Sequence, residues 1–562
     1  MKKARVLCLV LCIVFAFSVM LTACTPKTEP TPTPAPTATP SPGVTPDPQP
    51  TELAKPDRIE ITKTFYFGDS TEHLVYKREY MEWFTDKYGI QLVVNYPSRA
   101  NFIEVINLSA MSGDLKGLVH MFSVPELFTW ANEGLIYPVT DLLKDNEIWN
   151  TVIPEFWKED VTYQGEIWAI PAGSDNRPSY FARHIRGDWL DTLGLQVPDT
   201  IEQFYEAIYK MTFNDPNKSG SNDTIGMTAR TSWLMGDIYM TFDARVNHLN
   251  APMPSYNPNS ELWEDPVIKP EMVTALTWVK KGVDEGIIFP EMYTAGASTV
   301  RGQMTSGYAG SIFDWVHQRN GWNVAIKAVD ENGYFVTIGA MKGTTAANQK
   351  VNFYGVGGGN PYALMQGTPQ AKEMANWFVN IFFGSPEGVY SGRIGILGTL
   401  RGTGAFTIEG NKIYANFLPP TAAGGNPVGY PAPGIIGGLP MYELDRVYEY
   451  VYYSDNPTWN ETSTATRLMQ QNDLNDIFDK YSARLWAVTE SLKEPSCDLW
   501  LNQGVRGDQS AAAAEALSTA IAGDVTITEA IAKYRGIAKA LNMQKVLDDA
   551  NEALGKTSSQ TY

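Results

Sequence analysis

Residues 58–96 read RIEITKTFYFGDSTEHLVYKREYMEWFTDKYGIQLVVNY, and this stretch decides the fold class of the chain. Residues 58–67 alternate apolar and polar side chains, as a half-buried strand does. Residues 74–88 have the spacing of an amphipathic helix, and residues 89–96 predict a second strand. Strands that are separated by helices usually pair in parallel, so the stretch predicts an α/β fold on a parallel sheet.

The same alternation continues along the chain. Residues 102–111 predict a helix, and residues 118–122 predict a short buried strand. A later helix opens at Thr200, where Gln203 completes a capping box. Two further helical regions are predicted: one from Thr368-Pro369 to about residue 383, and two closing helices within residues 511–554.

The N-terminus has the pattern of a secretion signal. Lys2, Lys3 and Arg5 precede an apolar run over residues 6–20, which is too short for a confident membrane span. Residues 21–24, Leu-Thr-Ala-Cys, look like a bacterial lipobox, in which Cys24 receives the lipid after residues 1–23 are removed. The alternative is an ordinary signal peptide with an incidental cysteine.

The segment that follows Cys24 is rich in Pro and Thr up to residue 56. It has too few large apolar residues to fold, so we expect an extended spacer that holds the folded part away from a membrane. Of the four cysteines, Cys497 alone remains in the folded part, which excludes an intramolecular disulfide there.

Composition excludes some partners and favours others. The chain of 562 residues carries a net charge of −18, which argues against nucleic-acid binding and against a basic membrane-docking surface. Its 15 Trp and 28 Tyr residues mostly belong to cores, but such an excess is also typical of sugar-binding clefts, where rings stack on the sugar.

Two segments resemble a known family. Residues 162–171 read TYQGEIWAIP, and residues 186–198 read RGDWLDTLGLQVP. Both look like segments of extracellular solute-binding proteins of carbohydrate ABC importers, of the large LipO-like or alginate-oligosaccharide-binding type. The resemblance is collinear from about residue 60 to residue 490.

The resemblance implies an α/β, two-lobed periplasmic-binding-protein fold with a hinge, an interlobe ligand cleft and extra C-terminal helices. The ligand would lie between lobes that close around it. The expected organisation of residues 57–562 is lobe 1 at about 57–170 and 305–390, lobe 2 at about 171–304 and 391–500, and closing helices at 501–556.

The resemblance also suggests ligand-binding residues. A loop after residue 171 carries Asp175, Asn176 and Arg177, which can hydrogen-bond sugar hydroxyls or pair with a uronate; the alternative is a solvated polar loop. Trp315 is the expected stacking platform, and Asp314 is expected to accept from hydroxyls, although a core position is the commoner fate of a tryptophan. Location alone suggests four more aromatic residues: Trp130, Tyr180, Trp233 and Tyr430.

A candidate calcium loop begins at Asp215. Oxygen-bearing side chains stand at its positions 1, 3, 5 and 9, and Gly220 occupies the position of the sharp turn. The resembled family carries a structural Ca²⁺ here, with the Ser221 carbonyl as a further ligand. The expected ligands are Asp215, Asn217, Ser219, Ser221 and Asp223. Thr224 and Gly226 replace acidic residues, which predicts a weaker site, and the alternative is a solvated turn.

These observations favour a binding protein over an enzyme. The five histidines are scattered, and neither an HExxH motif nor a GxSxG elbow occurs. The prediction is a monomeric, lipid-anchored protein on the extracellular face of a Gram-positive type of membrane. It would deliver an oligosaccharide, acidic or neutral, to an ABC permease. A secreted glycan hydrolase, a glycan-binding adhesin or sensor, and a peptide ligand stay open as alternatives.

Overall fold

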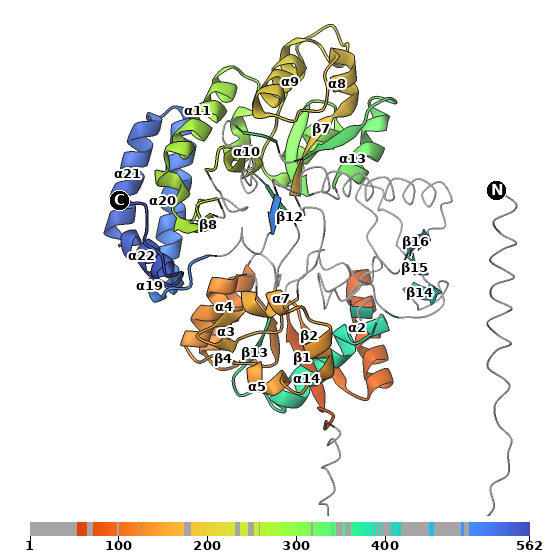
Figure 1. Ribbon diagram of the computed structural model, residues 1–562. Coiled ribbons are helices and arrows are strands. Elements are labelled where there is room, and N and C mark those ends of the chain that lie inside the picture. The colour runs from red at the N-terminus through yellow and green to blue at the C-terminus, as the bar shows by residue number, and fades with distance from the viewer. Residues whose placement is uncertain are drawn as a thin grey trace, which may run out of the picture. The chain divides into compact units, whose positions relative to one another are not determined.

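The structure is a computed structural model, in which the chain from Ala54 to Tyr562 forms one unit (Figure 1). It describes residues 53–63, 71–97, 101–121, 123–172, 181–230, 236–244, 252–257, 259–315, 318–339, 341–343, 352–354, 361–385, 387–388, 391–392, 396, 406–410, 412–416, 449–453, 485–487 and 494–562.

The first sheet has the strand order β2-β1-β3-β13-β4. Its strands are β1 (Arg58–Thr62), β2 (Gln91–Asn95), β3 (Leu118–His120), β4 (Ile136–Tyr137) and β13 (Tyr362–Met365). The first three are parallel, as the sequence predicts, whereas β13 runs antiparallel to both β3 and β4. The sheet is therefore mixed, because a strand from a remote part of the chain enters it.

Helices cover both faces of this sheet, at the lower part of Figure 1. The main ones are α2 (Thr71–Tyr88) and α14 (Ala371–Phe383) on one face, and α3 (Phe102–Met111) and α4 (Val124–Asn132) on the other. Leu118 packs into the core with α14, while its neighbour Val119 packs into the core with α3 and α4. This alternation is the period of two that a strand buried on both faces requires. Together with the short elements that follow α4, these layers form the first lobe.

The short elements of the first lobe complete its edge. They are α5 (Thr140–Leu143), α6 (Glu147–Thr151), α7 (Glu155–Asp160), β5 (Thr162–Tyr163) and β6 (Glu166–Ile167). Ile170 then forms a bridge with Tyr362, so the chain returns to the first sheet before it leaves the lobe.

The second sheet centres on β7 (Phe181–Arg186), which pairs antiparallel with β10 (Ser311–Trp315) and β11 (Phe335–Ile338). The segment from Ile225 to Arg230 runs alongside β10, since Ile225 bridges to Ala309 and the Thr228 amide donates to the Ser311 carbonyl at 2.8 Å.

Helices and a hairpin surround this second sheet and form the second lobe. They are α8 (Gly187–Leu193), α9 (Ile201–Phe213), α10 (Gly236–Thr241), β8 (Ser255–Asn257), β9 (Leu262–Glu264), η2 (Pro266–Ile268), α11 (Pro270–Asp284), η3 (Pro290–Tyr293), α12 (Ala297–Thr305), α13 (Gln318–Ala325) and η4 (Ile326–Ala328). The predicted capping box at the start of α9 is confirmed, with Thr200 and Gln203 satisfying each other's backbone amides.

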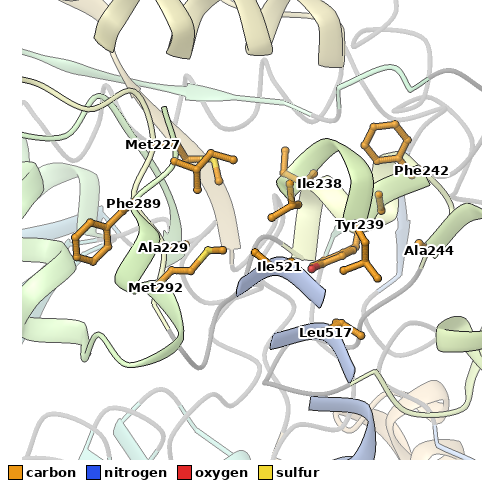
Figure 2. Packing of buried hydrophobic residues seen from close by; sticks show 14 of the residues in the cluster. Met227, Ala229, Ile238, Tyr239, Phe242, Ala244, Phe289, Met292, Leu517 and Ile521 are labelled. Carbon is orange, nitrogen blue, oxygen red and sulfur yellow. The ribbon is translucent and has the colours of Figure 1, made fainter. Parts of the chain in front are cut away.

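The C-terminal helices share the core of the second lobe. Figure 2 shows Leu517 and Ile521 of α20 beside Tyr239 of α10. The helices are α19 (Asp498–Leu501), α20 (Gln503–Ala522), α21 (Ile527–Ala540) and α22 (Met543–Glu552), so the closing region contains more helices than the two predicted.

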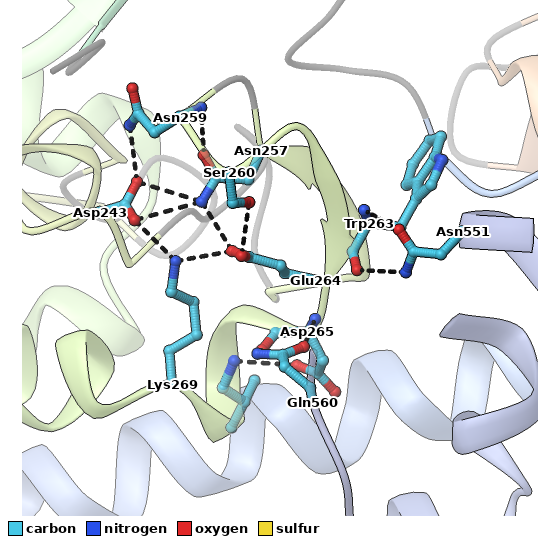
Figure 3. A network of polar contacts seen from close by, with 11 residues as sticks. Asp243, Asn257, Asn259, Ser260, Trp263, Glu264, Asp265, Lys269, Asn551 and Gln560 are labelled. Carbon is cyan, nitrogen blue, oxygen red and sulfur yellow. Dashed lines mark hydrogen bonds and ion pairs between the residues drawn. The ribbon is translucent and has the colours of Figure 1, made fainter. Parts of the chain in front are cut away.

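A polar network ties the β8–β9 hairpin to these helices (Figure 3). The side chain of Asn551 on α22 exchanges two 2.9 Å hydrogen bonds with the backbone of Trp263. Nearby, Lys269 forms ion pairs with Asp243 at 2.8 Å and Glu264 at 2.7 Å. Burial alone would lower the pKa of Lys269, but the two carboxylates raise it above its usual value.

The expected lobe boundaries need one correction. Residues 305–390 were assigned to the first lobe, but β10 and β11 pair with β7, and Trp322 and Phe335 lie in the second core. Only the part from β13 onward returns to the first sheet. The chain therefore leaves the first lobe after residue 172 and comes back to it before residue 362.

Helix α19 contacts both cores. Trp500 is fully buried in the core of the second lobe, and the next residue, Leu501, is buried in the α3–α4 core of the first lobe. The Thr129 hydroxyl of α4 donates to the Leu501 carbonyl at 2.9 Å.

The remaining strands lie in smaller sheets: β12 (Asn352–Tyr354) with β17 (Leu485–Ala487), and β14 (Phe406–Glu409), β15 (Lys412–Asn416) and β16 (Glu449–Tyr453).

Candidate ligand-binding site

The first sheet has a topological switch point beside β1. The chain passes from β1 through α2 to β2 on one side, and then through α3 to β3 on the other side. In α/β sheets, ligands bind outside the carboxyl ends of strands at such a reversal. The candidate site is therefore the carboxyl edge of β1 and β3, which we call the first sheet edge.

Two titratable residues stand at the first sheet edge. Lys63 directly follows β1, and His120 is the last residue of β3. The pairing of Thr62 with Val119 places the next residues of the two strands, Lys63 and His120, side by side. Both are only 3% exposed. Burial lowers the pKa of Lys63 to about 7, and burial followed by the charge of Lys63 holds the pKa of His120 well below its usual range.

Tyrosines surround this pair. Tyr362 of β13 stands opposite His120, with 5.1 Å between their ring centroids. Tyr96 follows the carboxyl end of β2, and its pKa is raised well above the usual value by burial and then by Tyr362 and Tyr80. The first sheet edge therefore combines an amine, an imidazole and phenol rings, and the amine, the imidazole and the Tyr362 ring are buried.

The second sheet presents a different group at the end of β10. Both carboxylate oxygens of Asp314 accept from Arg301, each at 2.7 Å, and Asp314 is fully buried while the Arg301 side chain is 27% exposed. This geometry favours a positioning role for Asp314 instead of the expected hydroxyl contact, and it leaves Arg301 as the group that reaches outward.

Arg230 lies in the same electrostatic neighbourhood. Its pKa is lowered to about 10, chiefly by burial; Asp314 acts in the opposite direction, and Arg301 contributes to the lowering. Two guanidinium groups thus interact with the single carboxylate of Asp314. We call this group, Arg230, Arg301 and Asp314 at the end of β10, the second sheet edge.

The end of β10 pairs with the start of β7, because Trp315 is the register partner of Phe181. Six predicted ligand-binding residues lie outside the described residues: Asp175, Asn176, Arg177, Tyr180, Trp233 and Tyr430. The side chain of Trp315 and the lipidation residue Cys24 lie outside them as well.

Trp130 belongs to a core. It is 2% exposed, packs among the residues of α3 and α4, and donates its indole N–H to the Asn107 side chain at 3.0 Å. The structure therefore contradicts the predicted stacking role and supports the alternative of a core tryptophan. Its partner Asn107 satisfies the indole, so the ring has no need of a ligand.

The predicted calcium loop folds back on itself. The Asp223 carboxylate accepts from the Asn217 amide at 2.9 Å and from the Ser219 hydroxyl at 3.0 Å, and both contacts lower the pKa of Asp223. Asp215 accepts from the backbone amides of Ser219 and Gly220 at 2.8 and 2.9 Å. Gly220 has a φ of +79°, which suits the sharp turn of such a loop.

These contacts bring the predicted oxygen ligands together. The Ser219 hydroxyl also lies 3.3 Å from the Ser221 carbonyl. The donor set is one of carboxylate, amide, hydroxyl and carbonyl oxygens, which fits a hard cation such as Ca²⁺. Within the described residues, no cluster of three or more His, Cys, Asp or Glu side chains has the arrangement of a metal site.

Sequence reasoning missed Lys63, His120, Arg230 and Arg301. Lys63 was placed inside a strand predicted to run to residue 67, whereas β1 ends at Thr62. A lysine directly after two buried positions of a strand can indicate that the strand ends there, at the edge of the sheet. No helix in the described parts of the chain combines the length and apolar character needed to cross a bilayer.

Comparison with known families identifies the chain. The family model for bacterial extracellular solute-binding proteins matches residues 68–389. The chain belongs to this family. The matched region includes β3 and β13 of the first sheet and β7 and β10 of the second.

Individual relatives are similar over parts of the sequence. Lipoprotein LipO of Bacillus subtilis strain 168 is 24% identical over 262 residues, which cover 46% of this chain and 51% of LipO. FusA of Streptococcus pneumoniae serotype 4, a fructooligosaccharide ABC transporter substrate-binding protein, is 32% identical over 145 residues, or 23% of this chain and 26% of FusA. The chain thus spans about half the length of LipO, and about a quarter of FusA.

Solved structures match over most of the chain. A FusA structure aligns with a TM-score of 0.63 and 16% identity over 89% of this chain and 99% of FusA. The alginate-binding protein AlgQ2 also aligns with a TM-score of 0.63 and 16% identity, over 89% of this chain and 98% of AlgQ2. At these identities the likeness concerns the fold, and it confirms the predicted two-lobed α/β architecture.

Proposed function

We propose that this chain is an extracellular solute-binding protein that captures an oligosaccharide and delivers it to the permease of an ABC importer. The observation that carries the proposal is the family match over residues 68–389, which includes strands of both sheets. The names of the relatives add support, since FusA is a fructooligosaccharide substrate-binding protein and AlgQ2 is an alginate-binding protein.

The proposed mechanism uses the two sheet edges. The ligand binds in a cleft between the lobes, with the first sheet edge on one side and the cations of the second sheet edge on the other. Contacts from the second lobe add affinity that only the closed state offers, so the ligand shifts the population toward closure. The permease recognises the closed form, and the ligand leaves chemically unchanged.

A binding screen tests this proposal. The full chain, purified in detergent, is melted in the presence of neutral oligosaccharides, acidic oligosaccharides and short peptides, and hits are confirmed by calorimetry. We expect at least one class of oligosaccharide to raise the melting temperature, because a ligand that binds only the native state stabilises it. Binding of peptides alone, with no oligosaccharide at millimolar concentration, would contradict the proposal.

The lipid anchor on Cys24 is part of the proposal. It places the protein on the extracellular face of the membrane, and the similarity to lipoprotein LipO supports it. Metabolic labelling with a radioactive or clickable palmitate should mark the wild-type chain but not a Cys24→Ser variant. Equal labelling of both would contradict lipidation at Cys24.

We also propose that the loop from Asp215 to Asp223 holds a structural Ca²⁺. Asp215, Asn217, Ser219, Asp223 and the Ser221 carbonyl would supply its oxygens, and the ion would cross-link the loop. The loop contacts described above support this, and so do the neighbours, because the FusA structure is described as an EF-hand mutant and the AlgQ2 structure as without calcium ion.

A further inference from the structure

The buried amine of Lys63 has no counter-ion within the described parts of the chain. Lys63 is 3% exposed, burial is the one cause of its lowered pKa, and no described carboxylate forms an ion pair with it. Other buried lysines differ, since Lys158 pairs with Glu155 at 3.0 Å and Lys269 pairs with Asp243 and Glu264. Burial of an unpaired ammonium costs several kcal/mol, so such a residue needs a reason beyond packing.

The position of Lys63 supplies that reason. It stands beside His120 at the switch point of the first sheet, where ligands bind in sheets of this kind. We propose that the Lys63 ammonium binds a carboxylate of the ligand, which is therefore an acidic oligosaccharide that contains uronic acid. This inference rests on the proposed function and narrows it to a ligand class.

The surroundings suit a uronic acid. The fully buried ring of Tyr362 lies 5.1 Å from the imidazole of His120, so aromatic side chains keep this edge apolar. A ligand carboxylate beside the amine would form a charge-assisted hydrogen bond in a site shielded from water, where such bonds are strong. We infer that the ligand reaches this edge when the lobes open, a motion that the proposed function includes.

Proton uptake should accompany binding. With a pKa of about 7 in the free protein, Lys63 loses its proton as the pH rises above neutrality. Among the described residues, the titratable group beside it is His120, which contacts Tyr362, and Tyr362 in turn interacts with Tyr96, which also interacts with Tyr80. The pKa of His120 is held well below 6.5 by burial and Lys63, and burial raises those of Tyr80 and Tyr96 above 10. A bound carboxylate favours the ammonium, so affinity for an acidic ligand should be highest below about pH 7 and should fall as the pH rises.

The test compares each acidic glycan with its own neutral counterpart. Oligosaccharides from digests of pectin, alginate and glycosaminoglycans are used before and after chemical reduction of their carboxyl groups to alcohols. Binding to the full chain in detergent is measured by calorimetry for the wild type, for Lys63→Met and for Lys158→Met. The last variant is the matched control, because Lys158 is a buried lysine of the same lobe with its own partner, Glu155.

We expect the wild type to bind at least one acidic digest and to lose most of this affinity when the carboxyl groups are reduced. Lys63→Met should weaken binding of the acidic glycan by roughly 30-fold or more, the usual effect of removing one partner of a buried charge pair. Lys158→Met should bind like the wild type. Thermal melting of Lys63→Met, which keeps the volume of the side chain, verifies that the variant is folded.

Other outcomes overturn the inference. Equal affinity of Lys63→Met and the wild type for the acidic glycan would contradict the role of Lys63. Preference of the wild type for the reduced or other neutral glycans would contradict it too. Both outcomes are compatible with the proposed function. Binding of no oligosaccharide of either kind would overturn the proposed function itself. The affinity of the wild type should also fall between pH 6 and pH 9 while that of Lys63→Met stays constant, and a flat wild-type profile counts against the role of Lys63.

Discussion

At the scale of the residue, buried charges separate structure from function in this protein. Arg183 and Asp237 form a bidentate ion pair with distances of 2.8 and 2.7 Å, and both are almost completely buried. The two charges of such a pair neutralise each other, so no ligand charge is required there. Lys63 is equally buried but has no described carboxylate beside it. The Arg183–Asp237 pair is therefore structural, whereas we propose that Lys63 binds the ligand.

The Arg183–Asp237 pair predicts a large stability effect. Asp237→Asn leaves a buried guanidinium without its counter-charge, so the free energy of unfolding should fall by about 3 to 5 kcal/mol. The control is Glu515→Gln, which removes an exposed pair with Lys533 and should cost less than about 1 kcal/mol. Denaturant unfolding measures both. Similar costs for the two variants would show that burial does not govern these pairs.

At the scale of the element, local signals were predictable and remote pairings were not. The capping box of Thr200 and Gln203 could be predicted because it depends on residues three positions apart. The insertion of β13 between β3 and β4 could not, since its partners lie in a distant part of the sequence. The candidate site follows the same division. The turn from Asp215 to Asp223 depends on neighbouring residues and could be predicted, whereas the first sheet edge exists only because two strands lie side by side.

Helix α19 predicts a coupling between the lobes. Leu501 is buried in the core of the first lobe, whereas Trp500 of the same helix is buried in the core of the second. Leu501→Ala should lower the free energy of unfolding by about 2 to 5 kcal/mol, because it leaves a cavity in that core. Leu108→Ala, on the 71% exposed Leu108 of α3, is the control and should change stability by less than about 0.5 kcal/mol. If Leu501→Ala leaves the free energy of unfolding unchanged, the Leu501 side chain does not stabilise the core of the first lobe.

The loop from Asp215 to Asp223 predicts a calcium effect on stability. Chelation with EGTA should lower the melting temperature of the wild type, and added Ca²⁺ should restore it, because the ion binds only the folded loop. Asp215→Asn, which removes one coordinating charge, should melt at the same temperature with and without Ca²⁺. A wild-type melting temperature that ignores both chelator and Ca²⁺ would exclude a structural ion.

At the scale of the whole molecule, the sequence predicted the two-lobed α/β fold but misplaced one crossing. Residues 311–338 were assigned to the first lobe, yet they form β10 and β11 on either side of β7. Nothing local distinguishes a strand of one lobe from a strand of the other, because both are short apolar runs. Only the pairing with β7 reveals the assignment, and with it the position of Asp314 and Trp315 beside the start of β7.

The account depends on capture of an oligosaccharide that leaves unchanged. The most direct measurement is calorimetric titration of the full chain with the best ligand of the screen, followed by mass spectrometry of the ligand recovered after prolonged incubation. The account predicts saturable one-to-one binding and a recovered ligand of unaltered mass. Recovery of shortened or modified sugar, or the absence of saturable binding to any oligosaccharide, would contradict it.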